Sequence, residues 1–200
     1  MSEKLLKELI SACAATITAH VDRLTELDKA IGDGDHGANM QRGFTAIADI
    51  GEEIASLPFG KALQKAGMTL VMKVGGASGP LYGSLLMAMG KAAEQVPQDQ
   101  GEAAAMLNAG VEAVKMRGKS DAGAKTMLDV LVPLAAALSE GGVNCSDLRQ
   151  VAAGGLASTK NMKATKGRAS FLGERSIGHL DPGACSSALL VNAICDVLEA

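Results

Sequence analysis

The sequence predicts an all-α fold, and its composition and periodicity both lead to that prediction. Of the 200 residues 48% are hydrophobic but only 2% are aromatic, with no Trp and a single Tyr. Alanine and leucine, which favour helices, are plentiful, whereas strands favour β-branched and aromatic side chains. Apolar residues recur every three or four positions between glycine-containing breaks, which is the period of a helix. A chain of this length is expected to form one domain, residues 1–200, of about eight helices.

The first half of the chain contains four predicted helices, each with apolar residues at helical spacing. The second helix is expected to end before Pro58, because proline interrupts a helix. The fourth is expected to begin with Pro80, because the first turn does not need the N–H that proline lacks. The four predicted ranges are residues 2–24, 40–55, 59–74 and 80–95.

The second half contains four more predicted helices. The sixth is expected to bend at Pro133. Asn144 or Ser146 is the expected N-cap of the seventh helix. Asp181 is the expected N-cap of the eighth, with Pro182 at its first position. The predicted ranges are residues 102–116, 126–138, 145–165 and 182–198.

Charge, hydropathy and cysteine usage exclude several classes of protein. The formal net charge is −3, so the chain lacks the basic excess of a nucleic-acid-binding protein. No apolar run approaches the roughly 20 residues of a membrane span, and the mixed charges at the N-terminus are unlike a signal peptide. The four cysteines have no metal-ligand spacing and are expected to be reduced thiols. We therefore expect a cytoplasmic protein that binds neither nucleic acid nor membrane.

The chemistry is concentrated in residues 28–39, whose sequence is DKAIGDGDHGAN. Asp28, Asp33 and Asp35 fall close together with glycines between them. Like charges this close repel one another unless a cation lies between them, and glycine allows a tight backbone path. Oxygen ligands without a nearby Cys favour Mg²⁺ or Ca²⁺. An EF-hand is excluded because its bidentate Glu would fall on Phe44. We predict a Mg²⁺ site; a solvated Gly-rich turn is the alternative.

Two other loops have the small residues that are typical of phosphate sites. Residues 75–79, GGASG, are small enough for backbone N–H groups to touch a phosphate at a helix start. A turn that only packs two helices closely explains the same residues equally well. Residues 118–120, GKS, are not the end of a P-loop, because the leading glycine position holds Ala113 and no strand precedes it.

Basic residues and histidines give weaker indications. His36 lies inside the acidic segment, which favours a functional role, whereas His20 near the end of a helix is expected to be structural. The chemistry of His179, beside Asp181, leaves both roles open. Arg168 is a candidate phosphate contact. It ends a basic stretch that otherwise predicts a solvated helix face and that includes Lys160, Lys163 and Lys166.

These motifs together resemble those of the L, or nucleotide-binding, subunit of dihydroxyacetone kinase. The resemblance covers essentially the whole chain. It is most specific in residues 27–40 (LDKAIGDGDHGANM) and 173–184 (GERSIGHLDPGA), and it extends to residues 75–80, 117–119, 125–130 and 166–170.

The resemblance implies a single-domain barrel of eight antiparallel helices with the nucleotide site at one end. It implies that Asp28, Asp33 and Asp35 are catalytic residues, holding two Mg²⁺ ions that bind the phosphates of ADP, or of ATP when the nucleotide is phosphorylated. The implied nucleotide-binding residues are His36, Gly37, Ala38, Asn39, Ala77, Ser78, Gly118, Met127, Arg168, Asp181, Pro182 and Gly183.

The resemblance also implies a phosphotransferase that acts with partner proteins. The phosphoryl group would pass from the bound nucleotide to dihydroxyacetone, which a separate K subunit holds. Relatives of this length commonly depend on the phosphoenolpyruvate phosphotransferase system, in which a phospho-histidine M protein rephosphorylates the ADP in place. The alternatives are an ATP-dependent ketose or triose kinase subunit, a metal-dependent phosphatase, and a non-catalytic Mg-nucleotide-binding regulator. A transcription regulator is a further candidate partner.

Overall fold

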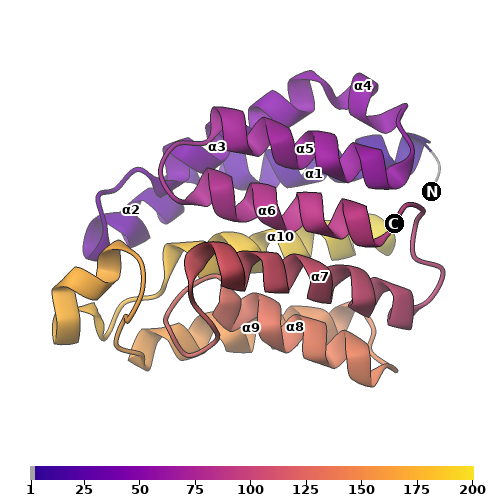
Figure 1. Ribbon diagram of the computed structural model, residues 1–200. Helices are drawn as coiled ribbons and strands as arrows, with labels where there is room; N and C mark the ends of the chain where they lie inside the picture. The colour runs from indigo at the N-terminus through magenta and orange to yellow at the C-terminus, as the bar shows by residue number, and fades with distance from the viewer. Residues whose placement is uncertain (1–2) are drawn as a thin grey trace.

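The computed structural model describes residues 3–200, and this range contains α-helices and short 3₁₀ helices but no strand. The all-α prediction is therefore confirmed. Eight long helices form a closed ring in which each helix packs against the next and the last packs against the first (Figure 1). In ring order they are α1 (Glu3–Ala19), α3 (His36–Asp49), α5 (Phe59–Lys73), α6 (Ser78–Ala92), α7 (Gln100–Gly118), α8 (Leu128–Glu140), α9 (Cys145–Ser158) and α10 (Pro182–Leu198).

Neighbouring helices of the ring run antiparallel, so the connections alternate between the two ends of the barrel. Both chain termini lie at the right-hand end in Figure 1, and the segments that follow α5, α7 and α9 lie at the left-hand end. Four shorter elements complete the fold: α2 (Val21–Ile31), α4 (Gly51–Ala55), η1 (Thr159–Asn161) and η2 (Arg168–Ser176). The motif-bearing loops consequently share one end of the barrel.

The predicted helix over residues 2–24 is wrong as a single element, because the chain breaks at His20. The ring Nδ1–H of His20 donates to the carbonyl oxygen of Thr16 at 2.8 Å, which a regular helix would use for the His20 backbone N–H. That N–H bonds the carbonyl of Ile17 instead, and α2 then begins at Val21. Apolar periodicity continues on both sides of the break, so the pattern did not reveal it. The predicted start at Ser2 lies outside the described residues.

The loop that carries the acidic segment is also shorter than the sequence indicated. Asp28 lies in the last turn of α2, and α3 begins at His36 rather than at residue 40. Only residues 32–35 connect the two helices. The predicted helix 40–55 is divided as well, because Ile50 leaves helical geometry between α3 and α4.

The predicted helix over residues 145–165 ends early, at Ser158. The hydroxyl of Ser158 donates to the carbonyl of Gly155, and that of Thr159 donates to the carbonyl of Leu156. Such side-chain bonds compete with the next helical turn, and the chain continues as η1. Residues 162–167 are therefore not helical, and the interpretation of the basic stretch as a helix face is wrong.

Other boundaries agree with the sequence prediction to within a few residues, and α10 agrees at both ends. Asp181 caps α10 by accepting the Ala184 N–H at 2.7 Å, with Pro182 in the first position. Asn144 caps α9 in a capping box with Asp147. Local side-chain chemistry determines these helix starts, which explains why the sequence predicted them.

Small residues let the helices of the barrel approach closely. A Cβ atom on Gly67 of α5 would lie 2.7 Å from the carbonyl oxygen of Gly83 of α6, and one on Gly83 would lie 2.8 Å from that of Gly67. Core side chains that are less than 2% exposed include Ile17, Leu24, Met40, Leu70, Val114, Leu128 and Cys185.

Within residues 3–200, no helix combines the length and the apolar character that crossing a membrane requires.

Candidate functional site

A pocket of about 180 Å³ opens at the end of the barrel where the motif-bearing segments meet. Five segments that are far apart in the sequence line it: the end of α2 with the loop to α3, the start of α6, the start of α8, the loop before η2, and the start of α10. The lining residues are Asp28, Ile31, Asp33, Asp35, His36, Gly76, Ala77, Ser78, Leu81, Tyr82, Lys125, Thr126, Met127, Lys166, Gly167, Arg168, Ala169, Asp181, Pro182 and Gly183.

Three acidic side chains converge at one side of this pocket. Each of Asp28, Asp33 and Asp35 offers a carboxylate oxygen, and these oxygens all lie within 4.8 Å of one another. Asp28 is buried, whereas Asp33 and Asp35 are exposed. Arg168 contacts Asp33, with 2.8 Å between Nη2 and Oδ2. This one guanidinium group offsets only one of the three carboxylate charges. A hard divalent cation such as Mg²⁺ fits this set of oxygen donors and its excess negative charge.

The backbone of the loop determines how Asp28 is oriented. Its Oδ2 accepts the backbone N–H of Asp35 at 2.9 Å and that of His36 at 3.1 Å. Its Oδ1 lies over Gly32, where a Cβ atom would be only 2.1 Å away. Gly34 has φ of +76°, a conformation that favours glycine. Gly32 therefore provides space and Gly34 provides the turn, and both are needed to bring the carboxylates together.

Three helix N-termini meet at the pocket. His36 is the first residue of α3, Ser78 of α6 and Pro182 of α10, and all three line the pocket. The helix dipole makes each N-terminus attractive to anions. Together with a cation on the acidic cluster, this arrangement suits a ligand with several phosphate groups.

His36 is held in a buried polar network. Its Nδ1 lies 3.0 Å from Ser78 Oγ and its Nε2 lies 2.9 Å from Ser186 Oγ. The hydroxyl of Tyr82 lies 2.8 Å from the hydroxyls of both Ser186 and Ser187. Burial lowers the pKa of His36 below its ordinary value, which favours a neutral imidazole that links three helices.

The sequence analysis named Ser78 but missed three other members of this network: Tyr82, Ser186 and Ser187. Tyr82 is the single tyrosine of the chain, and Ser186 and Ser187 are adjacent polar residues in a mostly apolar helix. Both features were available as signals, because a buried hydroxyl needs a partner. Lys125, Thr126, Lys166 and several glycine or apolar lining residues were also not named as site residues.

The predicted nucleotide-binding residues separate into two groups. His36, Ala77, Ser78, Met127, Arg168, Asp181, Pro182 and Gly183 line the pocket, whereas Gly37, Ala38, Asn39 and Gly118 do not.

Two residues of the second group have visible packing contacts. A Cβ atom on Gly37 would lie 2.3 Å from Thr25 Oγ1 of α2, so this glycine lets α3 close against α2. Asn39 is buried, and its Oδ1 would lie 2.9 Å from a Cβ atom on Gly75. The side chain of His179 is exposed, and its carbonyl accepts a hydrogen bond from Lys125.

Comparisons with known proteins found a matching family model and several similar proteins. The model of a family described as the DAK2 domain matches residues 30–196. The "PEP-dependent dihydroxyacetone kinase 1, ADP-binding subunit DhaL" of Listeria innocua is 50% identical over 172 residues, which cover 86% of this chain and 84% of the relative. The "PTS-dependent dihydroxyacetone kinase, ADP-binding subunit DhaL" of Lactococcus lactis is 44% identical over 175 residues, which cover 88% of this chain and 87% of the relative.

A solved structure extends the agreement to the fold. The dihydroxyacetone kinase from C. freundii in complex with AMP-PNP and Mg²⁺ superimposes with a TM-score of 0.80 and 25% sequence identity. The match covers 98% of this chain but only 34% of the C. freundii chain. The present chain thus spans about a third of that enzyme.

Proposed function

This chain belongs to the DAK2 domain family, and we propose that it is the ADP-binding subunit of a phosphoenolpyruvate-dependent dihydroxyacetone kinase. One observation carries the proposal: the acidic cluster lies beside a pocket that three helix N-termini also line. That pocket has the charge distribution expected for a metal-bound diphosphate. The 50% identity to an ADP-binding subunit supports the same ligand.

The proposed cofactors are ADP, which becomes ATP when it is phosphorylated, and two Mg²⁺ ions. Asp28, Asp33 and Asp35 would hold the metal. When bound, Mg²⁺ would neutralise the phosphate charge and orient the reacting oxygens. Arg168 is 70% exposed in its contact with Asp33, so its guanidinium can move to a phosphate oxygen at little cost.

The histidine of the described pocket is not free to carry a phosphoryl group, and the proposal assigns the three carboxylates to the metal. Both ring nitrogens of His36 are hydrogen-bonded, and no cysteine lines the pocket within the described chain. We therefore propose direct transfer from the nucleotide to dihydroxyacetone on a K-type partner subunit. A phospho-histidine M-type protein would restore the nucleotide in place.

Four finer expectations belong to the same proposal. The whole chain would be one nucleotide-binding domain, its location would be cytoplasmic, and a transcription regulator would be a further partner. The substrate specificity for the ketose would belong to the K-type subunit.

The purified protein is expected to carry tightly bound ADP with about two Mg²⁺, the metal content of two-metal phosphoryl sites. Denaturation followed by chromatography of the supernatant and metal analysis measures both. Protein free of nucleotide and metal that also binds neither on titration would contradict the proposed function.

The phosphoryl donor can be identified by steady-state turnover. If ADP is an enclosed cofactor, its dissociation is slow relative to turnover, so K-type subunit, dihydroxyacetone and excess ATP should give little sustained activity. Phosphoenolpyruvate with the phosphotransferase proteins, including M, should restore turnover without nucleotide in solution. Many turnovers on ATP alone, with labelled ADP exchanging within seconds, would instead indicate an ATP-dependent ketose kinase. Release of inorganic phosphate without a partner would indicate a phosphatase.

A further inference from the structure

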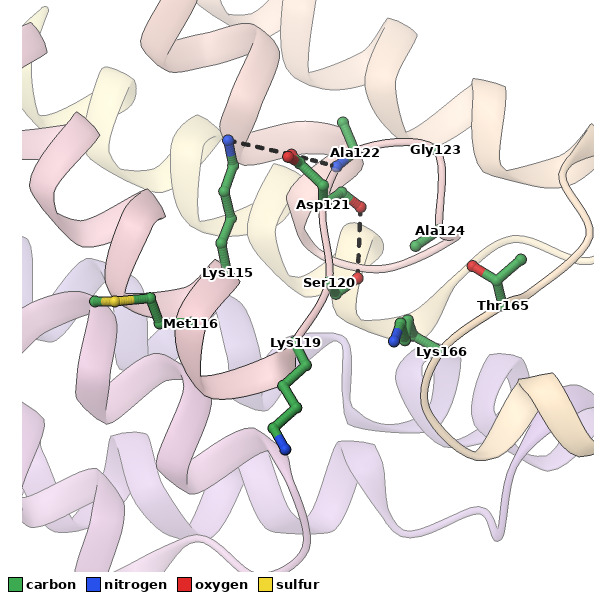
Figure 2. A pocket seen from close by; sticks show the side chains of 10 residues that line it. All are labelled: Lys115, Met116, Lys119, Ser120, Asp121, Ala122, Gly123, Ala124, Thr165 and Lys166. Carbon is green, nitrogen blue, oxygen red and sulfur yellow. Dashed lines mark hydrogen bonds and ion pairs between the residues drawn. The ribbon is translucent and has the colours of Figure 1, made fainter.

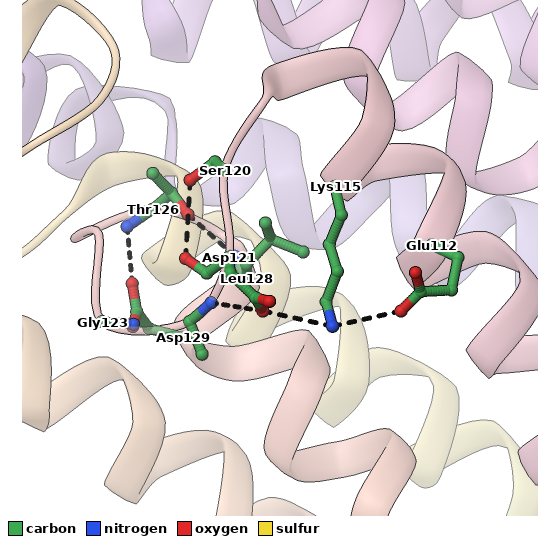
Figure 3. Close-up of polar contacts among 9 residues, drawn as sticks. Glu112, Lys115, Ser120, Asp121, Gly123, Thr126, Leu128 and Asp129 are labelled. Atoms are coloured by element: carbon green, nitrogen blue, oxygen red, sulfur yellow. Dashed lines mark hydrogen bonds and ion pairs between the residues drawn. The ribbon is translucent and has the colours of Figure 1, made fainter.

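The connection between α7 and α8 is a preorganised loop beside the nucleotide pocket. The Asp129 carboxylate, at the start of α8, accepts the backbone N–H of Gly123 at 2.5 Å and that of Thr126 at 2.7 Å (Figure 3). On the outer side, Lys115 contacts Asp121 at 3.1 Å. These contacts hold the loop in one shape before any ligand binds.

Two lysines of this loop have left-handed backbone geometry but opposite surroundings. Lys119 has φ of 47° and Lys125 has φ of 62°, and they are the non-glycine residues with positive φ in residues 3–200. Lys119 is exposed and lines an open cavity of about 590 Å³, where its side chain points away from Asp121 (Figure 2). Lys125 is only 1% exposed and lines the nucleotide pocket instead. A buried lysine in this strained conformation requires compensating contacts.

Lys125 finds those contacts in two backbone carbonyl groups. Its Nζ donates to the carbonyl oxygens of Thr159 and His179. Burial lowers the pKa of Lys125, while the negative charges of Asp181 and Asp129 oppose that shift. Within residues 3–200, no carboxylate lies within ion-pair distance of this ammonium group, so the carbonyl bonds are its direct partners.

The carbonyl of His179 lies two residues before Asp181, which lines the pocket, and Thr159 is bonded to Asp181 as well. Thr159 accepts the backbone N–H of Asp181 on its Oγ1 at 3.0 Å, and the carbonyl of Ala124 accepts the N–H of Thr165 at 3.2 Å. The ammonium of Lys125 is thus the centre of a group of bonds that joins residues 124–127, 159–165 and 179–181. Next to it, Gly183 lies against Met127, since a Cβ atom on Gly183 would be 3.5 Å from Met127 Cβ.

We propose that Lys125 is a positioning residue, which ties the segments at Thr159 and His179 to the α7–α8 loop and so holds the start of α10, where Asp181, Pro182 and Gly183 line the pocket. The proposal rests on the proposed nucleotide function. The acidic cluster has independent support, because Asp28 is oriented by the loop to α3. Ala169 and Leu172, which follow Arg168 in the sequence, pack with Ile31 of α2. Lys125 should therefore affect binding of the nucleotide and not of a metal ion at the acidic cluster.

The test compares MgADP with Mg²⁺ alone as ligands of nucleotide-stripped protein. Lys125→Gly removes the ammonium but suits the positive φ. Lys119→Gly is the matched control, with similar backbone geometry and an exposed side chain. For Lys125→Gly we expect MgADP affinity to fall about ten- to a hundredfold, as for residues that orient binding groups. Affinity for Mg²⁺ alone, at the acidic cluster, should stay within about twofold of that of the unsubstituted chain. Lys119→Gly should change neither affinity.

A rescue experiment separates positioning from general loss of structure. Added n-butylammonium should restore part of the MgADP affinity of Lys125→Gly, whereas butanol should not, because only the cation can donate to both carbonyls. If far-UV circular dichroism shows that Lys125→Gly is unfolded, Lys125→Met, which keeps most of the side-chain volume, serves for the ligand comparison. An equal loss of affinity for both ligands, or no loss of affinity for either, would overturn the proposal. Failure of the unsubstituted chain to bind MgADP would contradict the proposed function instead.

Discussion

Asp33→Asn is expected to reduce phosphoryl transfer to dihydroxyacetone by at least about a hundredfold, because even residues that only orient metal ligands cost ten- to a hundredfold. The substitution keeps the size of the side chain but removes one of the three charges that face the metal. The measurement is coupled turnover with the K-type subunit and the phosphoryl donor, together with calorimetric titration of Mg²⁺ in the presence of ADP. Activity close to that of the unsubstituted chain would mean that the acidic segment is only a turn.

The stability of the metal-free protein gives the control for this substitution. Asp33 loses its contact with Arg168, but that pair is largely exposed and such pairs contribute at most about 1 kcal/mol. Relief of repulsion from Asp28 and Asp35 acts in the opposite direction. We therefore expect the free energy of unfolding to change by less than about 1 kcal/mol. Asp49→Asn, at an exposed carboxylate outside the pocket, should leave both activity and stability unchanged.

Gly32→Ala is expected to weaken metal binding about ten- to a hundredfold, although the substituted residue is not a ligand. The added Cβ would lie 2.1 Å from Asp28 Oδ1, so the carboxylate must rotate and lose its bonds to the N–H groups of Asp35 and His36. Backbone strain does not contribute, because φ of Gly32 is −144°. Titration of Mg²⁺ with ADP present measures the effect.

The matched control for that substitution is Gly154→Ala, in α9. No atom lies within 4 Å of the position of its Cβ, and alanine favours a helix over glycine by up to about 1 kcal/mol. Gly154→Ala should therefore stabilise the protein slightly and leave metal binding unchanged. If Gly32→Ala also left metal binding unchanged, the orientation of Asp28 would not depend on Gly32.

The sequence alone was sufficient for the features that local interactions determine. Helix-forming composition and apolar periodicity predicted the all-α class, and Asp181 with Pro182 predicted the start of α10. The acidic cluster was also predictable, since its three carboxylates and their glycines lie within one short segment. Each of these features depends on residues a few positions apart, whose preferences survive in any compact fold.

Tertiary structure decided the features that distant residues share. The His36 ring bonds Ser186, which is 150 positions away, and Lys125 bonds the carbonyl of His179, 54 positions away. The break at His20 was invisible for a related reason: the apolar rows of α1 and α2 continue across it, and only packing shows that two helices share them. A sequence pattern records which residues prefer burial, but not which distant partners will satisfy a buried imidazole or ammonium group, because those partners are selected only when the barrel closes.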